Sequence, residues 1–300
     1  MTMKKLLFTG ASGFLGNNIR PILEKNYDVH TIGLADDDDI KINMAKEVPT
    51  INTHYDVVLH AAGKAHTVPK TEDEKQVFYD VNYTGTIHLC DALEKVGAPQ
   101  ALVFISTVAV YGCEFGELIT EEHPLKGTTP YAESKLQAEE YLTSWCANHG
   151  VVLGILRPSL LAGPKAPGNL GAMVFGIQKG FYLNIAGGKV KKSVLMAEDI
   201  ARLFPLVAEK GGIYNVCDSY QPSFGELSAS VARQLGKRKP ISIPYWMAWC
   251  MAKVGDLLGS KAPINSYKLE KMTKSLTFSN EKARRELGWE PLDVLTHYKI

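Results

Sequence analysis

Short runs of mostly apolar residues recur through the first half of the chain. They span Lys5–Thr9, Val29–Gly33, Val57–Ala61 and Leu102–Ser106, and a comparable run follows at Val151–Leu156. Short apolar runs without polar alternation are typical of strands that are covered on both faces. The pattern therefore predicts a parallel β-sheet buried between helices.

Longer segments with a helical spacing of apolar residues separate these runs. They are Gly13–Asn26, Asp73–Val96 and Pro130–Asn148. Pro21 lies inside the first of them and predicts a kink or an early end, because proline lacks the backbone donor that a helix interior needs. Alternating strands and helices predict an α/β fold with a doubly wound parallel sheet.

The alternation weakens after Arg157, where glycine and proline pairs such as Gly163-Pro164 and Gly187-Gly188 indicate loops. We therefore expect residues 1–164 to form the doubly wound domain, with later segments returning to it. Residues 165–300 are expected to form mainly a smaller, interleaved part that binds the substrate.

Composition narrows the class of protein. The 300 residues carry a formal net charge of +1, so no basic field favours nucleic acid. The five cysteines are scattered, without a CxxC pair, so neither a metal site nor a disulfide framework is indicated. An odd, scattered set of cysteines suits a reducing compartment, and we expect a cytoplasmic protein.

Two segments bear on membrane attachment. The apolar run Leu6–Phe8 is too short for a signal peptide, and no stretch approaches the ~18 apolar residues of a membrane span. The segment Trp246–Leu258 is the nearest candidate for a helix on a membrane surface, but Lys253 and Asp256 interrupt it. We expect it to be a core or interface helix rather than the surface anchor.

A glycine-rich segment links the first predicted strand to the first helix. It has the spacing GxxGxxG and comprises Gly10, Ala11, Ser12, Gly13, Phe14, Leu15 and Gly16. Gly10 permits a sharp turn, Gly13 permits the backbone to approach a pyrophosphate, and Gly16 permits close helix–strand packing. The helix start adds free N–H groups and partial positive charge. We expect Gly10, Ser12, Gly13, Phe14, Leu15 and Gly16 to bind a dinucleotide.

An acidic residue about twenty positions further on usually bonds the adenosine ribose 2′-OH. The second predicted strand ends at Gly33, and Leu34 follows, so neither an acid nor a base lies at its tip. Asp36 could reach round from the loop, but we favour interpreting Asp36–Asp39 as a solvated acidic run. We therefore expect modest selectivity that favours NAD(H), with NADP(H) also possible.

A tyrosine and a lysine lie four residues apart, at Tyr131 and Lys135, and so share one face of a predicted helix. An ammonium group beside a phenol favours phenolate, lowers its pKa and suits the tyrosine to proton transfer. Thr107 follows the strand Leu102–Ser106, at the sheet edge where α/β proteins bind ligands, so its hydroxyl could hold the same substrate oxygen. These three residues are the predicted catalytic group.

Seven motifs occur in order: TGASGFLG, LHAAG, DVNYTGT, FISTVAVYG, YAESK, LRPSLLAGP and RELGWEP. Together they resemble the extended short-chain dehydrogenase/reductase family, specifically its NAD-dependent nucleotide-sugar epimerase/dehydratase group, over nearly the whole chain. The resemblance implies a Rossmann-type NAD(P)-binding domain, a nucleotide-linked sugar as substrate, and a homodimer formed by the helices in Asp73–Val96 and Pro130–Asn148.

The resemblance also assigns roles. Tyr131 would be the catalytic acid/base, Lys135 would hold the nicotinamide ribose, and Thr107 would contact the substrate as the family's serine/threonine. Further positions that would line the cofactor are Asn43, Met44, Ala61, Ala62, Gly63, Pro158 and Ser159. Asn43 stands where the family often has aspartate.

Substrate residues are predicted less directly. Asn169 and Lys192 match positions that bind the diphosphate in similar epimerases, where the second is arginine; lysine keeps the charge but loses the bidentate fork. His66, past the end of a predicted strand, could also reach the substrate. We interpret His60 as a satisfied core histidine and Trp289 as a packing residue.

The reaction is narrowed by Val108 and Ala109, which stand where 4,6-dehydratases of the family have Asp-Glu. Neither can move a proton, so dehydration is set aside. We expect a nucleotide-sugar 4-epimerase of surface-polysaccharide biosynthesis, with reduction of a 4-keto nucleotide sugar as the alternative. A non-catalytic cofactor sensor or scaffold is less favoured, because such proteins usually lose part of the Thr–Tyr–Lys set, which is intact here.

Overall fold

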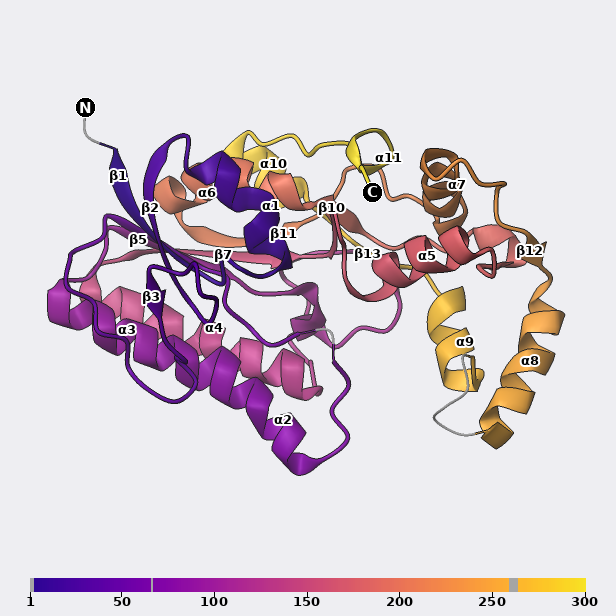
Figure 1. The fold of residues 1–300 in the computed structure, drawn as a ribbon, viewed down its shortest axis with the longest axis horizontal. Helices are drawn as coiled ribbons and strands as arrows, with labels where there is room; N and C mark the ends of the chain where they lie inside the picture. The colour runs from indigo at the N-terminus through magenta and orange to yellow at the C-terminus, as the bar shows by residue number, and fades with distance from the viewer. Residues whose placement is uncertain (1–2, 66, 259–263) are drawn as a thin grey trace.

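A seven-stranded parallel sheet forms the centre of the protein in a computed structural model that describes residues 3–65, 67–258 and 264–300 (Figure 1). Its strand order is β11-β7-β5-β4-β1-β2-β3. The strands are β1 (Lys4–Thr9), β2 (Tyr27–Gly33), β3 (Ile40–Lys41), β4 (Val57–His60), β5 (Ala101–Ile105), β7 (Val152–Pro158) and β11 (Gly212–Val216). The order reverses at β1 and β4, so the carboxyl ends of these two strands border the crevice where such sheets bind ligands.

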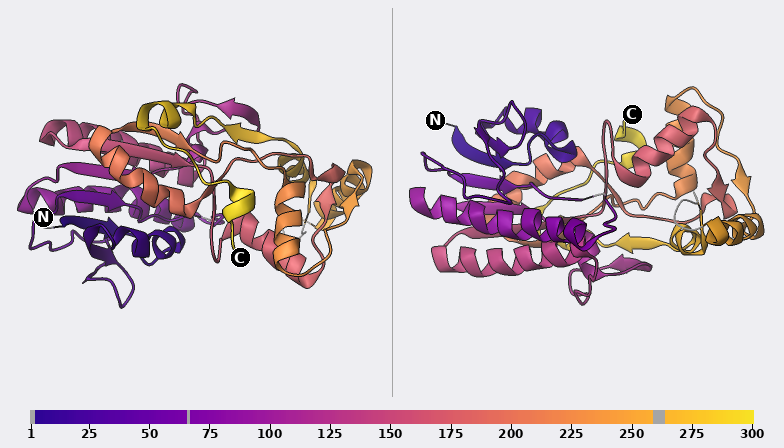
Figure 2. Two further views of the ribbon diagram at one scale, coloured as in Figure 1. Left: turned by 90° about the horizontal axis from the view of Figure 1, so that it is seen from above. Right: turned by 60° about the horizontal axis from the view of Figure 1, so that its bottom comes forward.

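Helices cover both faces of this sheet (Figures 1 and 2). One face packs against α1 (Phe14–Leu23), α6 (Ala197–Lys210) and α10 (Glu281–Leu287). The other packs against α3 (Gly85–Val96) and α4 (Pro130–His149). Each face has its own apolar core, which explains why the strands are apolar throughout rather than alternating. The predicted Rossmann-type fold class is confirmed.

The predicted elements differ from the observed ones mainly at their ends. Helix α1 ends at Leu23, two residues after Pro21, as the proline indicates. The predicted helix Asp73–Val96 is continuous but has three parts: α2 (Glu72–Tyr79), a π-helical segment η1 (Asp80–Thr84) and α3. Sequence periodicity did not indicate η1, because a π segment inserts only a local change of hydrogen bonding.

The remaining elements form a smaller part beside the carboxyl end of the sheet (Figure 2). Its helices are α5 (Gly168–Lys179), α7 (Phe224–Gln234), α8 (Tyr245–Leu258), α9 (Ser266–Thr273) and α11 (Val294–His297). Three strand pairs accompany them: β8 (Leu160–Ala162) with β10 (Val194–Met196), β9 (Asn184–Ile185) with β12 (Ser242–Ile243), and β6 (Gly116–Ile119) with β13 (Leu276–Phe278). Between them, α6 and β11 return to the central sheet.

Two glycines allow the loop between β1 and α1 to pack closely. Gly10 has φ +78°, and a Cβ atom built on it would lie 2.6 Å from the Ala62 nitrogen. A Cβ on Gly16 would lie 2.2 Å from the Ala11 carbonyl oxygen, whereas one on Gly13 would meet only the Gly10 oxygen, at 3.3 Å. Gly16 is therefore required for folding, while Gly13 keeps space open outside the core.

We predict that Gly16→Ala lowers the free energy of unfolding by about 2 kcal/mol or more, because the backbone on both sides of the clash must move. Gly13→Ala is the matched control and should cost under about 1 kcal/mol, since its Cβ needs a shift of only a few tenths of an ångström. Urea unfolding followed by circular dichroism measures both. Equal losses in the two variants would contradict the packing role of Gly16.

Candidate active site

The loop Gly10–Gly16 presents an anion site at the start of α1. Gly13 is the N-cap residue of α1, no side chain among the described residues caps it, and the first turn contains no acid. The N–H groups of this turn remain available, and the helix dipole favours a negative charge there. These features fit a dinucleotide pyrophosphate, as the sequence predicts.

A chain of hydrogen bonds fixes the neighbouring segment Ala61–Gly63. The Ala62 N–H donates to Thr9 Oγ1 at 3.1 Å, and Thr9 Oγ1 lies 2.7 Å from His60 Nδ1. His60 Nε2 lies 2.8 Å from Thr86 Oγ1, which donates to the Asn82 carbonyl at 2.7 Å. Since Thr86 uses its proton on that carbonyl, His60 must donate from Nε2 and accept at Nδ1.

His60 is fully buried, and burial together with the nearby Lys135 charge lowers its pKa to about 3. It therefore stays neutral at physiological pH. The interpretation of His60 as a satisfied core histidine is confirmed, and its hydrogen bonds couple the ends of β1 and β4 to α3.

Asn82, in the π-helical segment, continues this coupling toward α4. Its side chain donates to Ser134 Oγ at 2.9 Å and to the Lys64 carbonyl at 3.2 Å, and it accepts from the Lys64 N–H at 2.7 Å. A Cβ on Gly63 would lie 3.1 Å from both Asn82 Oδ1 and Lys135 Nζ. Asn82 belongs to the DVNYTGT motif, but sequence reasoning did not identify it as the residue that positions the segment Ala61–Lys64.

The predicted catalytic residues come from two elements. Thr107 follows β5 and accepts the Ala109 N–H, which begins a short 3₁₀ turn, η2 (Val108–Tyr111). Tyr131 and Lys135 lie one turn apart near the start of α4, and the Thr107 side chain hydrogen-bonds the Tyr131 phenol. The structure thus brings Thr107 and Tyr131 together at the carboxyl end of β5.

Lys135 is buried below them. Its ammonium group donates to the Ile105 carbonyl at 2.9 Å and lies 4.4 Å from the centre of the Phe104 ring. Burial lowers the pKa of Lys135 to about 8, and the nearby Glu139 carboxylate opposes this shift. Lys135 is therefore still mostly protonated at neutral pH.

The prediction that Lys135 lowers the pKa of Tyr131 is wrong for this structure. Burial raises the pKa of the phenol, and the hydrogen bond with Thr107 opposes that shift. Lys135 is not among the groups that shift it, and its ammonium group is held by the Ile105 carbonyl and the Phe104 ring. Tyr131 is accordingly a protonated phenol, suited to donating a proton.

A buried ion pair anchors these elements to each other. Arg157 Nε lies 3.1 Å from Glu139 Oε1, and its Nη2 lies 2.5 Å from Oε2. Ser106 Oγ also donates to Glu139, and Arg157 Nη1 donates to the Tyr111 hydroxyl at 3.0 Å. Sequence reasoning missed this network, because no local motif predicts a pairing between residues on different elements.

Pro158 and Ser159 continue directly from Arg157 at the end of β7. The Ser159 N–H donates to the Val216 carbonyl at 3.1 Å. Its hydroxyl is buried and has no hydrogen-bond partner among the described residues. Because a buried polar atom without a partner is costly, this hydroxyl fits a site that a polar group of a ligand completes.

The adenine side of the predicted cofactor site differs from expectation at Asp38. Asp36 is exposed and paired with Lys41, as the solvated interpretation requires. Asp38, however, is buried and accepts the Ala35 N–H at 2.9 Å, and a Cβ on Gly33 would lie 2.2 Å from its Oδ2. An acid therefore does lie against the end of β2, and the solvated interpretation is wrong for Asp38.

Asn43 and Met44 follow β3 in the chain. The Asn43 side-chain oxygen accepts the Ala45 N–H at 3.1 Å, which closes a local turn. Met44 is buried in the core on the α3 side of the sheet, and its carbonyl accepts from His88 at 2.7 Å. Met44 thus serves packing, whatever contact it also makes with a ligand.

The predicted substrate residues are only partly assembled. Lys192 is half-buried and precedes Ser193, whose carbonyl accepts the Leu160 N–H at 3.3 Å, so it lies next to the strand that follows Ser159. Asn169 is exposed near the start of α5, and no hydrogen bond among the described residues links it to Lys192. His66 lies outside the described residues.

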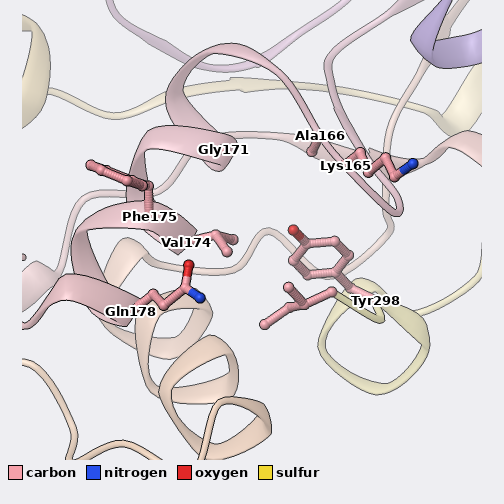
Figure 3. Close-up of a pocket in the computed structure, with 8 residues that line it drawn as sticks. Lys165, Ala166, Gly171, Val174, Phe175, Gln178 and Tyr298 are labelled. Carbon is pink, nitrogen blue, oxygen red and sulfur yellow. The ribbon is translucent and has the colours of Figure 1, made fainter.

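No group of three or more His, Cys, Asp or Glu side chains that could hold a metal ion occurs in the described part of the chain. A hollow of about 210 Å³ lies between α5 and the C-terminal residues, with Val174, Phe175, Gln178 and Tyr298 in its wall (Figure 3). None of its lining residues belongs to the predicted catalytic group, so this hollow is separate from the candidate site.

A sequence model of the NAD dependent epimerase/dehydratase family matches residues 6–217, which include the phosphate loop, Thr107, Tyr131, Lys135 and Ser159. The chain belongs to this family. The family assignment and the expected dependence on a nicotinamide cofactor are confirmed.

Relatives within this epimerase/dehydratase family differ in substrate. An Escherichia coli O157:H7 protein named N-acetyl-alpha-D-glucosaminyl-diphospho-ditrans,octacis-undecaprenol 4-epimerase is 27% identical, over 92% of this chain and 88% of its own. A GDP-6-deoxy-D-mannose reductase from Pseudomonas aeruginosa is 27% identical, over 75% of this chain and 78% of its own. The fold resembles that of RMD from Pseudomonas aeruginosa, solved with NADPH, at 21% identity and a TM-score of 0.72, over 99% and 96% of the two chains.

The position of Asp38 predicts the nicotinamide preference of this family member. Asp38→Asn keeps the hydrogen bond to Ala35 but removes the negative charge, so NADPH should gain about tenfold in affinity relative to NADH. Asp36→Asn, which removes an exposed charge from the same loop, is the control and should change the ratio little. Titrations of both variants with NADH and NADPH measure this. An equal shift in both would mean that the loop acts only through its net charge.

Proposed function

We propose that the protein is an NAD(P)-dependent 4-epimerase that acts on a sugar joined to a diphosphate. The observation that carries this proposal is the assembly of Thr107, Tyr131 and Lys135 beside the phosphate loop and the buried Ser159 hydroxyl. The family and the 4-epimerase relative support it. A cofactor sensor or scaffold would not need a hydroxyl, a phenol and a buried ammonium group held together.

In this proposal each residue has one task. Tyr131 exchanges a proton with the oxygen on C4 of the sugar, and Thr107 holds that oxygen by a hydrogen bond. Lys135, anchored on the Ile105 carbonyl, keeps a positive charge near Gly63 and the cofactor ribose. NAD(P) held by the loop Gly10–Gly16 would supply the hydride transfer at C4 that inversion requires. Because His60 is neutral, the positive charge beside Gly63 comes from Lys135.

The protonated state of Tyr131 supports a second candidate reaction, which is reduction of a 4-keto sugar. Burial raises the pKa of this phenol, so it is a proton donor at neutral pH, as a keto oxygen that becomes a hydroxyl requires. A reductase occurs among the relatives. Dehydration stays set aside, because Val108 and Ala109 carry no ionisable group.

The proposal of a sugar diphosphate as substrate rests on the positive charge of Lys192. Lys192 would contact the diphosphate, with Asn169 beside it. A diphosphate joins the sugar to a nucleoside in most substrates of such enzymes, but it joins the sugar to undecaprenol in the substrate that the name of the Escherichia coli relative specifies. Both substrate forms present the same charge to Lys192, so both belong in the test.

We further propose a cytoplasmic homodimer that pairs through α2, α3 and α4. No helix among the described residues is long and apolar enough to cross a membrane. Tyr83 of η1 and Tyr141 of α4 contact each other edge to face, at 6.3 Å between ring centres, and so join two neighbouring segments of the surface that would pair.

The function is tested by incubation of the purified protein with UDP-, dTDP- and GDP-sugars, 4-keto sugars and a polyprenyl diphosphate-linked sugar. NAD(P)H absorbance and product identity are followed. We expect interconversion of C4 epimers without net change in absorbance. Stoichiometric oxidation of NAD(P)H with a 4-keto sugar would instead identify a reductase, and no turnover with any of them would contradict both candidates.

Tyr131→Phe removes the proton donor but keeps the ring, so turnover should fall about 10²–10⁴-fold while substrate binding changes little. Tyr141→Phe is the matched control: it makes the same change on the same helix, away from Thr107, and should leave turnover near the wild-type value. Steady-state kinetics of both variants checks the prediction. Near-normal turnover of Tyr131→Phe would rule out the proposed role.

A further inference from the structure

Helix α8 packs with its smallest side chains inward. Of its described residues, only Ala248, Ala252 and Gly255 are buried. The two alanines pack with Leu269 of α9 and Ile185 of β9. Their spacing of four and three residues defines one face of the helix. The large side chains are therefore left on the other faces, which is the reverse of an ordinary core helix.

The opposite face of α8 is apolar and exposed. It carries Trp246, Cys250, Val254 and Leu257, with Lys253 beside them, and we call these five residues the α8 outer face. The exposed fractions of Trp246, Val254 and Leu257 are 66%, 58% and 88%. Trp249 and Leu258, next to this face, are also exposed. The expectation for Trp246–Leu258 was a core or interface helix, and the burial of only its smallest side chains rules out the core alternative.

The position of α8 leaves this face free of the rest of the described chain. The helix lies at the end of the molecule farthest from β1 and β2, with α9 on its inner side (Figures 1 and 2). An apolar surface of this kind, containing tryptophan, is unusual on a monomer and marks a docking site.

The surrounding charge indicates what docks there. Residues 237–274 contain eight lysines and arginines and two acids, a net charge of +6, although the whole chain carries only +1. The basic residues flank α8 on both sides in the sequence, with Lys237, Arg238 and Lys239 before it. A second copy of the chain would bring like charges together, whereas an anionic surface would be attracted.

The α8 outer face is connected to the candidate active site through α9. Lys271 of α9 forms an ion pair with Glu114 at 3.0 Å, and Lys274 lies over the Phe115 ring, in the segment that follows η2. Lys271 is also close enough to lower the pKa of Lys192, although burial of Lys192 is the larger cause. Lys271 and Lys274 thus link α9, which packs against the inner side of α8, to the segment that follows η2, and Lys271 lies near Lys192.

We propose that the α8 outer face docks on the surface of an anionic phospholipid membrane, and that the active site takes a sugar diphosphate whose lipid stays in that membrane. The second half of this proposal rests on the proposed function; the first does not. Trp246, Val254 and Leu257 enter the boundary between headgroups and acyl chains, and Lys253, Lys237, Arg238 and Lys239 contact anionic headgroups. The diphosphate then lies within reach of Lys192 and Lys271.

Docking is tested by flotation of the whole protein with vesicles of phosphatidylcholine, with or without phosphatidylglycerol. We expect flotation only with phosphatidylglycerol and release by high salt. The double variant Trp246→Ser, Leu257→Ser should lose about tenfold or more in partitioning, because two large apolar side chains no longer leave water. Phe175→Ser, an exposed aromatic residue on α5, is the control and should float like wild type.

Three further measurements distinguish failure of docking from misfolding and from failure of the proposed function. NADH titration of the double variant should match wild type, which excludes misfolding. Its turnover of a polyprenyl diphosphate-linked sugar in the same vesicles should fall about tenfold, while turnover of soluble nucleotide sugars stays unchanged. Failure of wild type to float, or equal flotation of the double variant, would overturn docking whether or not the enzyme is active.

The oligomeric state gives the last reading. If the double variant alone loses a wild-type dimer in light scattering, the α8 outer face binds a second copy and the proposal is overturned. If the protein floats but turns over no sugar diphosphate of either kind, the proposed function fails while docking stands.

Discussion

The buried ion pair between Glu139 and Arg157 is the interaction on which the geometry of the candidate active site depends. It joins α4, which carries Tyr131 and Lys135, to β7, which leads to Ser159. Ser106 attaches the end of β5, and therefore Thr107, to the same carboxylate. A buried pair of this kind adds little net stability, but loss of one partner leaves an unpaired charge that costs about 3–5 kcal/mol. Its main contribution is therefore to fix the relative positions of three elements.

A second network fixes the cofactor side without any net charge. Its hydrogen bonds all run in one direction: Thr9 donates to His60, His60 donates to Thr86, and Thr86 donates to the Asn82 carbonyl. This order requires a neutral imidazole. Protonation of His60 at Nδ1 would take away the acceptor that the Thr9 hydroxyl proton uses, and would place a positive charge near the Lys135 ammonium group. This second network reaches Lys135 at Gly63, where a Cβ atom would lie 3.1 Å from both Asn82 Oδ1 and Lys135 Nζ.

The fold was predictable because its signals are local. Each apolar run forms a strand of the central sheet, and Gly10 and Gly16, which follow the first run, occupy positions where a side chain would collide with backbone. In the site, only the residues that belong to a sequence motif were predictable. Asp38 turns back onto the end of β2 through a loop, and Glu139 meets Arg157 across two elements, so neither pairing leaves a pattern in the sequence. The pKa of Tyr131 was predicted wrongly because burial, which exceeds the other effects there, cannot be read from residue spacing.

The π-helical turn at Asp80–Thr84 constrains how this segment can change in length. Each residue of a helix turns the chain by about 100°, so the extra residue of a π turn offsets α2 from α3 by that angle. Deletion of one residue would restore a regular α-helix while keeping every apolar side chain of α3 on the sheet. It would nevertheless rotate either α2 or Asn82 out of place. In the second case Asn82 would lose its hydrogen bonds to both Lys64 and Ser134. Homologous chains that keep this asparagine contact should therefore tolerate insertions in the loops on either side of the helix but not a change of length within it.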